Sequence, residues 1–170
     1  IFHKDIHPRN ILITEDRKPV IIDFGISLLE HTISKRPTEN EYTTRFSAPE
    51  YIRKEESKLQ SRTDFYSLSL CVLYSLLGHQ LFYEDENNES RLQKVVNLYK
   101  SYLSENGLKQ FQEVFRKSFD SDHNKRYFRY TELRDAINSL FEVINHTPDK
   151  PFALHFEPGI NPVEFIREIN

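Results

Sequence analysis

The chain lacks several residue types, and each shortage excludes a class of structure. Its 170 residues include no methionine, no tryptophan and a single cysteine. Because translation begins at methionine, a reading frame that opens at Ile1 is expected to lack its N-terminal part, unless processing removed that part. Cys71 has no second cysteine for an internal disulfide and lies in an apolar run, so the sequence favours a reducing, cytoplasmic location over secretion.

Glycine is nearly as scarce, and the four glycines lie far apart at Gly25, Gly78, Gly107 and Gly159. A loop that cradles phosphate groups needs glycines close together, so this spacing excludes such a loop within the chain. Long apolar runs are missing too. A membrane-spanning helix needs about 18 apolar residues in sequence, whereas the most apolar stretch, Leu70 to Leu77, contains Tyr74 and Ser75. We therefore expect no membrane span.

Neither sign of charge dominates the sequence. Lysine and arginine number 23 against 26 aspartates and glutamates, which gives a net charge of -3, and the basic residues form no block. The charge pattern therefore predicts no nucleic-acid partner. With 38% apolar and 29% charged residues, the composition is typical of a folded globular chain.

The spacing of apolar residues predicts a small β-hairpin followed mainly by helices. Ile11–Ile13 and Val20–Ile22 are short apolar runs on either side of a polar turn. Ser61–Leu77 has little polar face and predicts a helix buried on nearly all sides. Three more helices follow from a spacing of 3.6 residues. Their apolar positions are Leu92, Val95, Val96, Tyr99 and Leu103, then Leu108, Phe111, Phe115 and Phe119, then Leu133, Ile137, Leu140, Phe141 and Ile144.

Two segments have the polar composition of loops. The stretch from Leu28 to Thr44 is rich in Ser, Thr, Glu and Lys and shows no periodicity. Loops of this length inside a domain are commonly functional or disordered. From His146 onward, four prolines exclude a long helix, although the pattern of Val163 to Ile169 is compatible with a short one.

The residues best suited to chemistry lie near the start of the chain. His-Lys-Asp-Ile-His-Pro-Arg-Asn, residues 3–10, places Asp5 five residues before Asn10, and Asp23 follows the second apolar run. Magnesium prefers oxygen ligands and commonly binds one or two carboxylates together with substrate phosphates. Asn10 and Asp23 therefore suit a magnesium-nucleotide site, and Asp5 is suited to orienting and deprotonating a hydroxyl.

This constellation resembles the protein-kinase catalytic loop, H-R-D-x-x-x-x-N, followed by D-F-G. Further segments resemble, in the family's order, the substrate-docking stretch of serine/threonine kinases, the A-P-E that ends the activation segment, the start of the central helix and the arginine that pairs with the A-P-E glutamate. They are residues 43–47, residues 48–50, residues 64–68 and Arg126. Each short match alone is weak, whereas five in order are a strong signal.

The resemblance implies a fold that is mainly α with a small β-hairpin, namely the C-terminal lobe of the α+β protein-kinase fold. This lobe would occupy residues 1–145, with the catalytic loop at 3–10, D-F-G at 23–25, the activation segment at 23–50 and the central helix at about 61–77. Residues 146–170 would form a Pro-containing tail. The family's Gly-rich loop, strand lysine and glutamate partner precede the catalytic loop, so the N-terminal lobe is expected to be absent from this chain.

The resemblance also implies a reaction, in which the γ-phosphoryl group of ATP passes to Ser or Thr hydroxyls of a protein substrate. Asp5 would be the base, Asn10 and Asp23 would hold Mg²⁺ and ATP, and Thr43, seven residues before the A-P-E glutamate, would fix the orientation of Asp5. The structural residues would be His3, Glu50, Asp64 and Arg126. The 170 residues alone are expected to be inactive without the N-terminal lobe.

Two positions depart from the family pattern. Lys4 stands where most members have arginine, which keeps the charge but loses the bidentate fork that would hold a phosphorylated activation loop. His7 replaces the lysine that contacts the transferred phosphoryl group, and a neutral imidazole offers one donor and no fixed charge. His7 is therefore either a catalytic phosphate contact or an exposed loop residue.

Two other functions remain open from the sequence. A non-catalytic, pseudokinase-like interaction module would explain the missing lobe, but it has no physical need for Asp5, Asn10 and Asp23. A small-molecule phosphotransferase related to aminoglycoside and choline phosphotransferases would share the His-x-Asp pattern, but those relatives lack this activation segment. Taken singly, the loop residues are compatible with plain turns, Glu50 and Arg126 with unrelated surface charges, and Asp64 with a helix cap.

Overall fold

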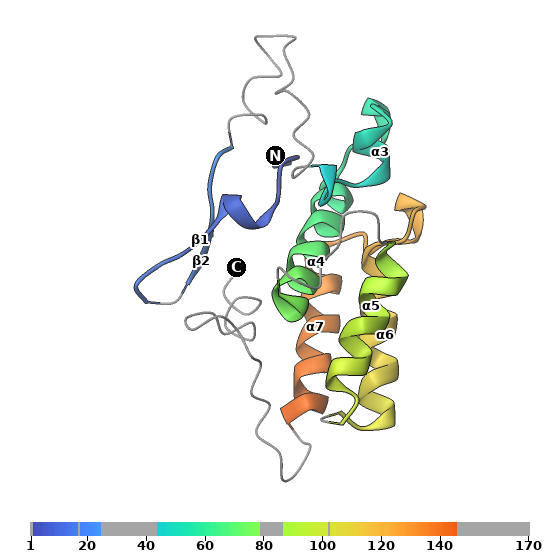
Figure 1. The fold of residues 1–170 in the computed structure, drawn as a ribbon. Coiled ribbons are helices and arrows are strands. Elements are labelled where there is room, and N and C mark those ends of the chain that lie inside the picture. Colours follow the sequence, from blue (N-terminus) through green and yellow to red (C-terminus); the bar gives the residue numbers. More distant parts are fainter. Residues whose placement is uncertain (1, 17, 25–43, 79–86, 102, 146–170) are drawn as a thin grey trace.

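The computed structural model describes residues 2–16, 18–24, 44–78, 87–101 and 103–145, the last five by their backbone alone. Within them the chain is mainly helical with one two-stranded antiparallel sheet, as the family resemblance implied (Figure 1). The elements are η1 (Pro8–Asn10), β1 (Ile11–Ile13), β2 (Pro19–Ile21), α3 (Pro49–Ile52), η2 (Glu56–Lys58), α4 (Ser61–Leu77), α5 (Asn88–Tyr99), α6 (Glu105–Ser118), η4 (His123–Lys125) and α7 (Tyr130–Asn145).

The hairpin lies to one side of the helices (Figure 1). Its register pairs Ile11 with Ile21, Leu12 with Val20 and Ile13 with Pro19. The second strand therefore begins and ends one residue earlier than the sequence predicted. A proline is tolerated as the first residue of a strand, and the N–H of the next residue after the strand, Ile22, donates to the Asn10 carbonyl at 2.9 Å.

Helix α4 occupies the residues predicted for the central helix. Gln60 and Thr63 form a reciprocal capping box at its start. Gly78 ends it with φ at 74°, a backbone conformation in the left-handed half of the map that glycine adopts at little steric cost. No side chain of α4 is exposed, and Leu70 and Leu73 are among the fully buried residues. The helix is thus enclosed on nearly all sides, as its apolar sequence predicts.

Helices α5 and α6 pack against α4 and against each other, and α7 packs against α6. Leu133 of α7 also shares a buried cluster with Phe65 of α4. Asn87 caps α5 by accepting from the N–H of Ser90, and Ser104 caps α6 by accepting from the N–H of Gly107. Helix α5 ends at Tyr99, so Leu103, which the periodicity placed in the same helix, lies outside it. Phe119 likewise follows the end of α6. Both side chains are nevertheless buried.

The core extends to residues within the catalytic loop and near the end of the activation segment. Ile6 and Phe46 belong to the same buried cluster as α4. The Phe46 ring meets the Tyr74 ring edge-on, with 5.6 Å between centroids. The segments that contain Ile6 and Phe46, which form no long helix or strand, are thereby packed against the central helix.

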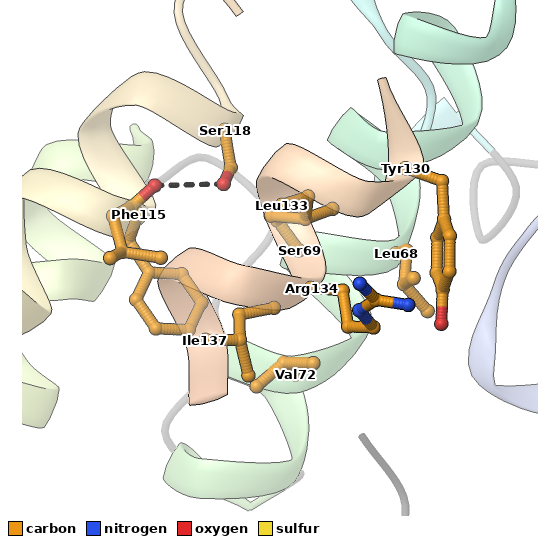
Figure 2. A pocket seen from close by; sticks show the side chains of 10 residues that line it. Leu68, Ser69, Val72, Phe115, Ser118, Tyr130, Leu133, Arg134 and Ile137 are labelled. Carbon is orange, nitrogen blue, oxygen red and sulfur yellow. Dashed lines mark hydrogen bonds between the residues drawn. The ribbon is translucent and has the colours of Figure 1, made fainter. Parts of the chain in front are cut away.

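A small cavity of about 30 Å³ lies between α4, α6 and α7 (Figure 2). The Ser69 and Ser118 hydroxyls both donate at 2.8 Å to carbonyls one turn earlier, those of Phe65 and Val114, so the lining is apolar. Its apolar side chains include Leu68, Val72, Phe115, Leu133 and Ile137. The space suits about two water molecules, and it shares no residue with the catalytic loop.

Several predictions concern residues on which the structure gives no information. The loop predicted over Leu28 to Thr44 falls almost wholly outside the described residues, and the short helix predicted over Val163 to Ile169 falls entirely outside them. Among the helices that the structure does describe, none combines the length and apolarity needed to cross a membrane.

Candidate catalytic site

Asp64 in the first turn of α4 holds the backbone of the catalytic loop. Its two carboxylate oxygens accept from the N–H groups of His3 and Lys4, each at 2.8 Å. Lys4 has φ at 67°, a strained conformation for a residue with a side chain, and these bonds help to hold it. Burial raises the pKa of Asp64, although the two N–H donors partly offset the effect. The N-cap of α4 is Gln60, so Asp64 anchors the loop and does not cap the helix.

His3 joins the loop to the end of the hairpin. Its side chain is buried, with Nδ1 accepting from the Asp5 N–H at 3.3 Å and Nε2 lying 2.9 Å from the Ile22 carbonyl oxygen. Both bonds form when Nε2 carries the ring proton. The ring also lies 4.5 Å, between centroids, from Phe24. His3 therefore fixes the position of Asp5 relative to the residues on either side of Asp23.

Asp5 and Asn10 are joined by hydrogen bonds, because the η1 turn brings the Asn10 side chain back to Asp5. The Asn10 Nδ2 group donates to the Asp5 carbonyl at 2.9 Å and to Asp5 Oδ2 at 3.2 Å. Two oxygen atoms are left over. Within the described residues, Asp5 Oδ1 is buried without a hydrogen-bond partner, and Asn10 Oδ1 accepts no hydrogen bond.

His7 lies directly beside this pair. Its Nε2 atom is 3.6 Å from Asp5 Oδ2, and the two side chains are only 9% and 14% exposed. The alternative of an exposed loop residue is therefore wrong. The distance exceeds that of a hydrogen bond, so the imidazole is near Asp5 without replacing Asn10 as its donor.

Asp23 is exposed and has φ at 64°, in the left-handed region that residues with a side chain seldom occupy. Such strain is often found at functional sites. The hydrogen bond between the Ile22 N–H and the Asn10 carbonyl places Asp23 one residue from the Asn10 backbone. An open amide oxygen and a neighbouring carboxylate fit Mg²⁺, whose remaining ligands are commonly waters and phosphates.

Within the part of the chain that the structure describes, no denser metal site competes with Asn10 and Asp23. Over the ranges of the chain that the structure describes, no group of three or more His, Cys, Asp and Glu side chains could hold a metal ion. A site built from Asn10 and Asp23 has only two protein ligands, which suits a metal that arrives with a nucleotide better than a permanently bound one.

The end of the activation segment is fixed by a buried ion pair. Arg126 Nη1 and Nη2 donate to Glu50 Oε1 and Oε2 at 2.7 and 2.9 Å, and the Thr63 hydroxyl donates to Oε1 at 3.0 Å. Glu50 and Arg126 are each 3% exposed, so the reading as unrelated surface charges is wrong. Burial opposes ionisation of Glu50, but the hydrogen bonds and the charge of Arg126 outweigh it and lower the pKa of Glu50.

Sequence reasoning missed two residues of this cluster. Thr63 links Glu50 to the start of α4, and the Tyr66 ring lies 4.7 Å from the guanidinium carbon of Arg126. The only sequence signal for Thr63 was its position next to Asp64. Thr43, predicted to orient Asp5, and Gly25 of the D-F-G motif lie outside the described residues.

Comparison with known proteins agrees with this geometry. The family described as "Protein kinase domain" matches residues 1–147. The chain is 25% identical over 154 residues to the "probable serine/threonine-protein kinase samkB" of Dictyostelium discoideum, covering 88% of this chain and 25% of that protein. It is 34% identical over 96 residues to the "receptor-like cytosolic serine/threonine-protein kinase RBK2" of Arabidopsis thaliana, covering 53% and 19%. The chain thus spans a quarter or less of these two relatives.

Proposed function

Because the chain belongs to the protein kinase family, we propose that it carries the catalytic loop of an enzyme that transfers the γ-phosphoryl group of ATP to Ser and Thr hydroxyls of proteins. The Asp5–Asn10 pair carries this proposal. One hydrogen bond holds the two side chains together, and each keeps one oxygen atom open. The two relatives, both named as serine/threonine kinases, support the choice of acceptor.

Each open oxygen atom suits one task. Asp5 Oδ1 would accept the proton of the attacking hydroxyl, because Oδ2 is already occupied by Asn10. Asn10 Oδ1 and the Asp23 carboxylate would hold the Mg²⁺ that accompanies ATP and neutralises charge on its phosphates. His7, 3.6 Å from Asp5 Oδ2, would contact the transferred phosphoryl group. Thr43 would help to orient Asp5.

The proposal extends to the organisation of the protein. Residues 1–145 would form the C-terminal lobe and residues 146–170 a tail, while an N-terminal lobe outside these residues would complete the ATP site. ATP and a protein substrate would be the partners. A reducing compartment suits Cys71, since its complete burial raises the pKa of the thiol and keeps it unreactive.

The experiment is phosphoryl transfer from labelled ATP by the full-length protein to a mixed Ser/Thr peptide library. We expect Asp5→Ala and Asp23→Ala each to lower the rate by at least about a hundredfold, because one removes the base and the other a metal ligand. Asp16→Ala, an exposed carboxylate in the hairpin turn, is the matched control and should keep the rate. Unchanged transfer in either site variant would contradict the proposal.

One observation favours a second candidate, the non-catalytic interaction module. Leu12 and Val20 face each other across the hairpin and are 52% and 42% exposed, which is the kind of apolar surface that a partner covers. Under that function, the Asp5→Ala variant would keep the binding of the partner. The small-molecule phosphotransferase is disfavoured by the buried Glu50–Arg126 pair, which anchors a segment that those relatives lack.

A further inference from the structure

Asn106 and Gly107 lie in the first turn of α6, just after its cap residue Ser104. This is the only place in the chain where a glycine follows an asparagine. Asparagine is a thermolabile residue, because the backbone nitrogen of the next residue can attack the carbon of its side-chain amide. Glycine has no Cβ, so its nitrogen hinders this attack least.

The reaction balances without a cofactor or an oxidant. The Gly107 nitrogen gives its proton to a base in solution and bonds to Asn106 Cγ. The bond from Cγ to Nδ2 then breaks, and ammonia leaves after taking up a proton from water. Water opens the resulting five-membered cyclic imide at either carbonyl carbon, which leaves aspartate or isoaspartate. The net change consumes water, releases ammonia and adds a negative charge to the chain.

The folded helix protects the attacking nitrogen but not the amide. Asn106 is exposed, whereas Gly107 is buried, and its N–H group donates to the Ser104 hydroxyl at 3.1 Å. The N–H of Leu108 donates to the Ser104 carbonyl at 2.9 Å, which also holds the turn closed. The Gly107 nitrogen is therefore engaged as long as the cap is formed.

The helical backbone is a second obstacle. In the cyclic imide, Asn106 Cβ and the Gly107 nitrogen eclipse each other about the Cα–C bond of Asn106. A helical ψ of about −42° keeps these two atoms apart. The reaction therefore requires the first turn of α6 to open, and the ends of helices open at a small cost in free energy.

We propose that Asn106 is a deamidation site and that the Ser104 hydroxyl controls its rate. The hydroxyl holds both the attacking nitrogen and the helical turn, so deamidation proceeds only while this cap is open. The inference concerns α6 alone and does not depend on the proposed function.

The two products should affect α6 differently. Aspartate at position 106 places a negative charge in the first turn, where the helix dipole favours it. Isoaspartate adds a carbon atom to the backbone before Gly107, so the Gly107 N–H loses its register with the Ser104 hydroxyl. The aspartate form should therefore restore the turn, and the isoaspartate form should leave it open.

The test is incubation of the full-length protein for several weeks, followed by proteolysis and mass spectrometry of the peptide that contains residue 106. The rate should rise with pH, because the attacking nitrogen must lose its proton. Asn97 is exposed on α5 and is followed by Leu98, so it is the internal control and should stay intact.

Ser104→Ala removes the cap and should raise the rate about fivefold, because the open turn becomes more populated by about that factor. Ser104→Thr keeps a capping hydroxyl and should react close to the wild-type rate. Circular dichroism checks that both variants fold. An unstructured peptide of residues 101–112 gives the unprotected rate. Equal rates in the alanine variant and the wild type would overturn the role of Ser104. An intact Asn106 in both proteins, over a time that converts the peptide, would overturn the site itself.

Discussion

Glu50 and Arg126 form a buried ion pair in which each charge is stabilised by the other. Both are buried, and their two hydrogen bonds of 2.7 and 2.9 Å satisfy charges that water cannot reach. The Arg126 Nε group also donates to the Asp120 carbonyl at 2.7 Å. Taking a charge out of water is costly, and its partner offsets that cost only while the partner is present.

We therefore expect Glu50→Ala and Arg126→Ala each to lower the free energy of unfolding by about 3–5 kcal/mol. Each single variant leaves one buried charge uncompensated, so the double variant should lose less than the sum of the two. Denaturant melts measure all three values. The exposed pair Glu105 and Lys109 on α6 is the control, and it should show almost no coupling. Additive losses for Glu50 and Arg126 would mean that they do not interact.

The same pair leads to a prediction of how stability depends on pH. The pKa of Glu50 is lower in the folded state than its ordinary value of 4.5. The stability that Glu50 contributes is therefore complete above pH 4.5 and is lost as the pH falls from 4.5 through the folded pKa. We expect Glu50→Gln to be less stable at neutral pH and to lose stability less steeply than the wild type between about pH 5 and 3. Parallel pH profiles of unfolding would contradict this.

At the scale of elements, the first turn of α4 is the shared anchor of the site. Asp64 holds the catalytic loop and Thr63 holds the end of the activation segment, and both attachments involve side chains on one helical turn. The Thr63 hydroxyl has a second partner, the Gln60 N–H at 3.2 Å, so it also caps the helix. Displacing this turn would move both segments together.

Thr63→Val tests this arrangement, because valine keeps the shape of threonine and removes its hydroxyl. The change leaves the Gln60 N–H without its cap and removes one donor from Glu50, so we expect a loss of about 1–3 kcal/mol in the free energy of unfolding. Thr63→Ser keeps both hydrogen bonds and should cost less. A larger loss for serine than for valine would show that the methyl group, and not the hydroxyl, is important.

The elements differ in how well their sequences predicted them. Helix α4 has little polar face and ends at Gly78, and the structure gives it the bounds that its sequence predicted. Helix α3 has only four residues, too few to show a period. In the site, the sequence predicted Asp5 as a base and Asn10 with Asp23 as metal ligands. It did not predict the hydrogen bond between the Asn10 amide and Asp5, because that bond depends on how the amide turns and residue spacing does not determine it.

At the scale of the whole molecule, the hairpin that connects Asn10 to Asp23 carries exposed apolar side chains. Leu12 and Val20 lie on the strands that connect Asn10 to Asp23, and both are exposed. The glycines are too far apart for a loop that covers phosphates. In the proposed function Asn10 and Asp23 would hold the metal and Asp5 would act as the base, but these residues would enclose little of a nucleotide.

This leads to a prediction for the isolated 170-residue chain. Its dissociation constant for Mg-ATP should be larger than about 100 μM, because the few contacts of Asn10 and Asp23 supply a binding free energy of less than about 5.5 kcal/mol. Calorimetry at low protein concentration measures the constant, and circular dichroism first establishes that α4 to α7 are folded. Because Asp23 would hold the metal, Asp23→Ala should remove whatever magnesium-dependent heat remains. Micromolar binding by the folded chain would mean that the hairpin surface and the catalytic loop alone suffice to bind the nucleotide.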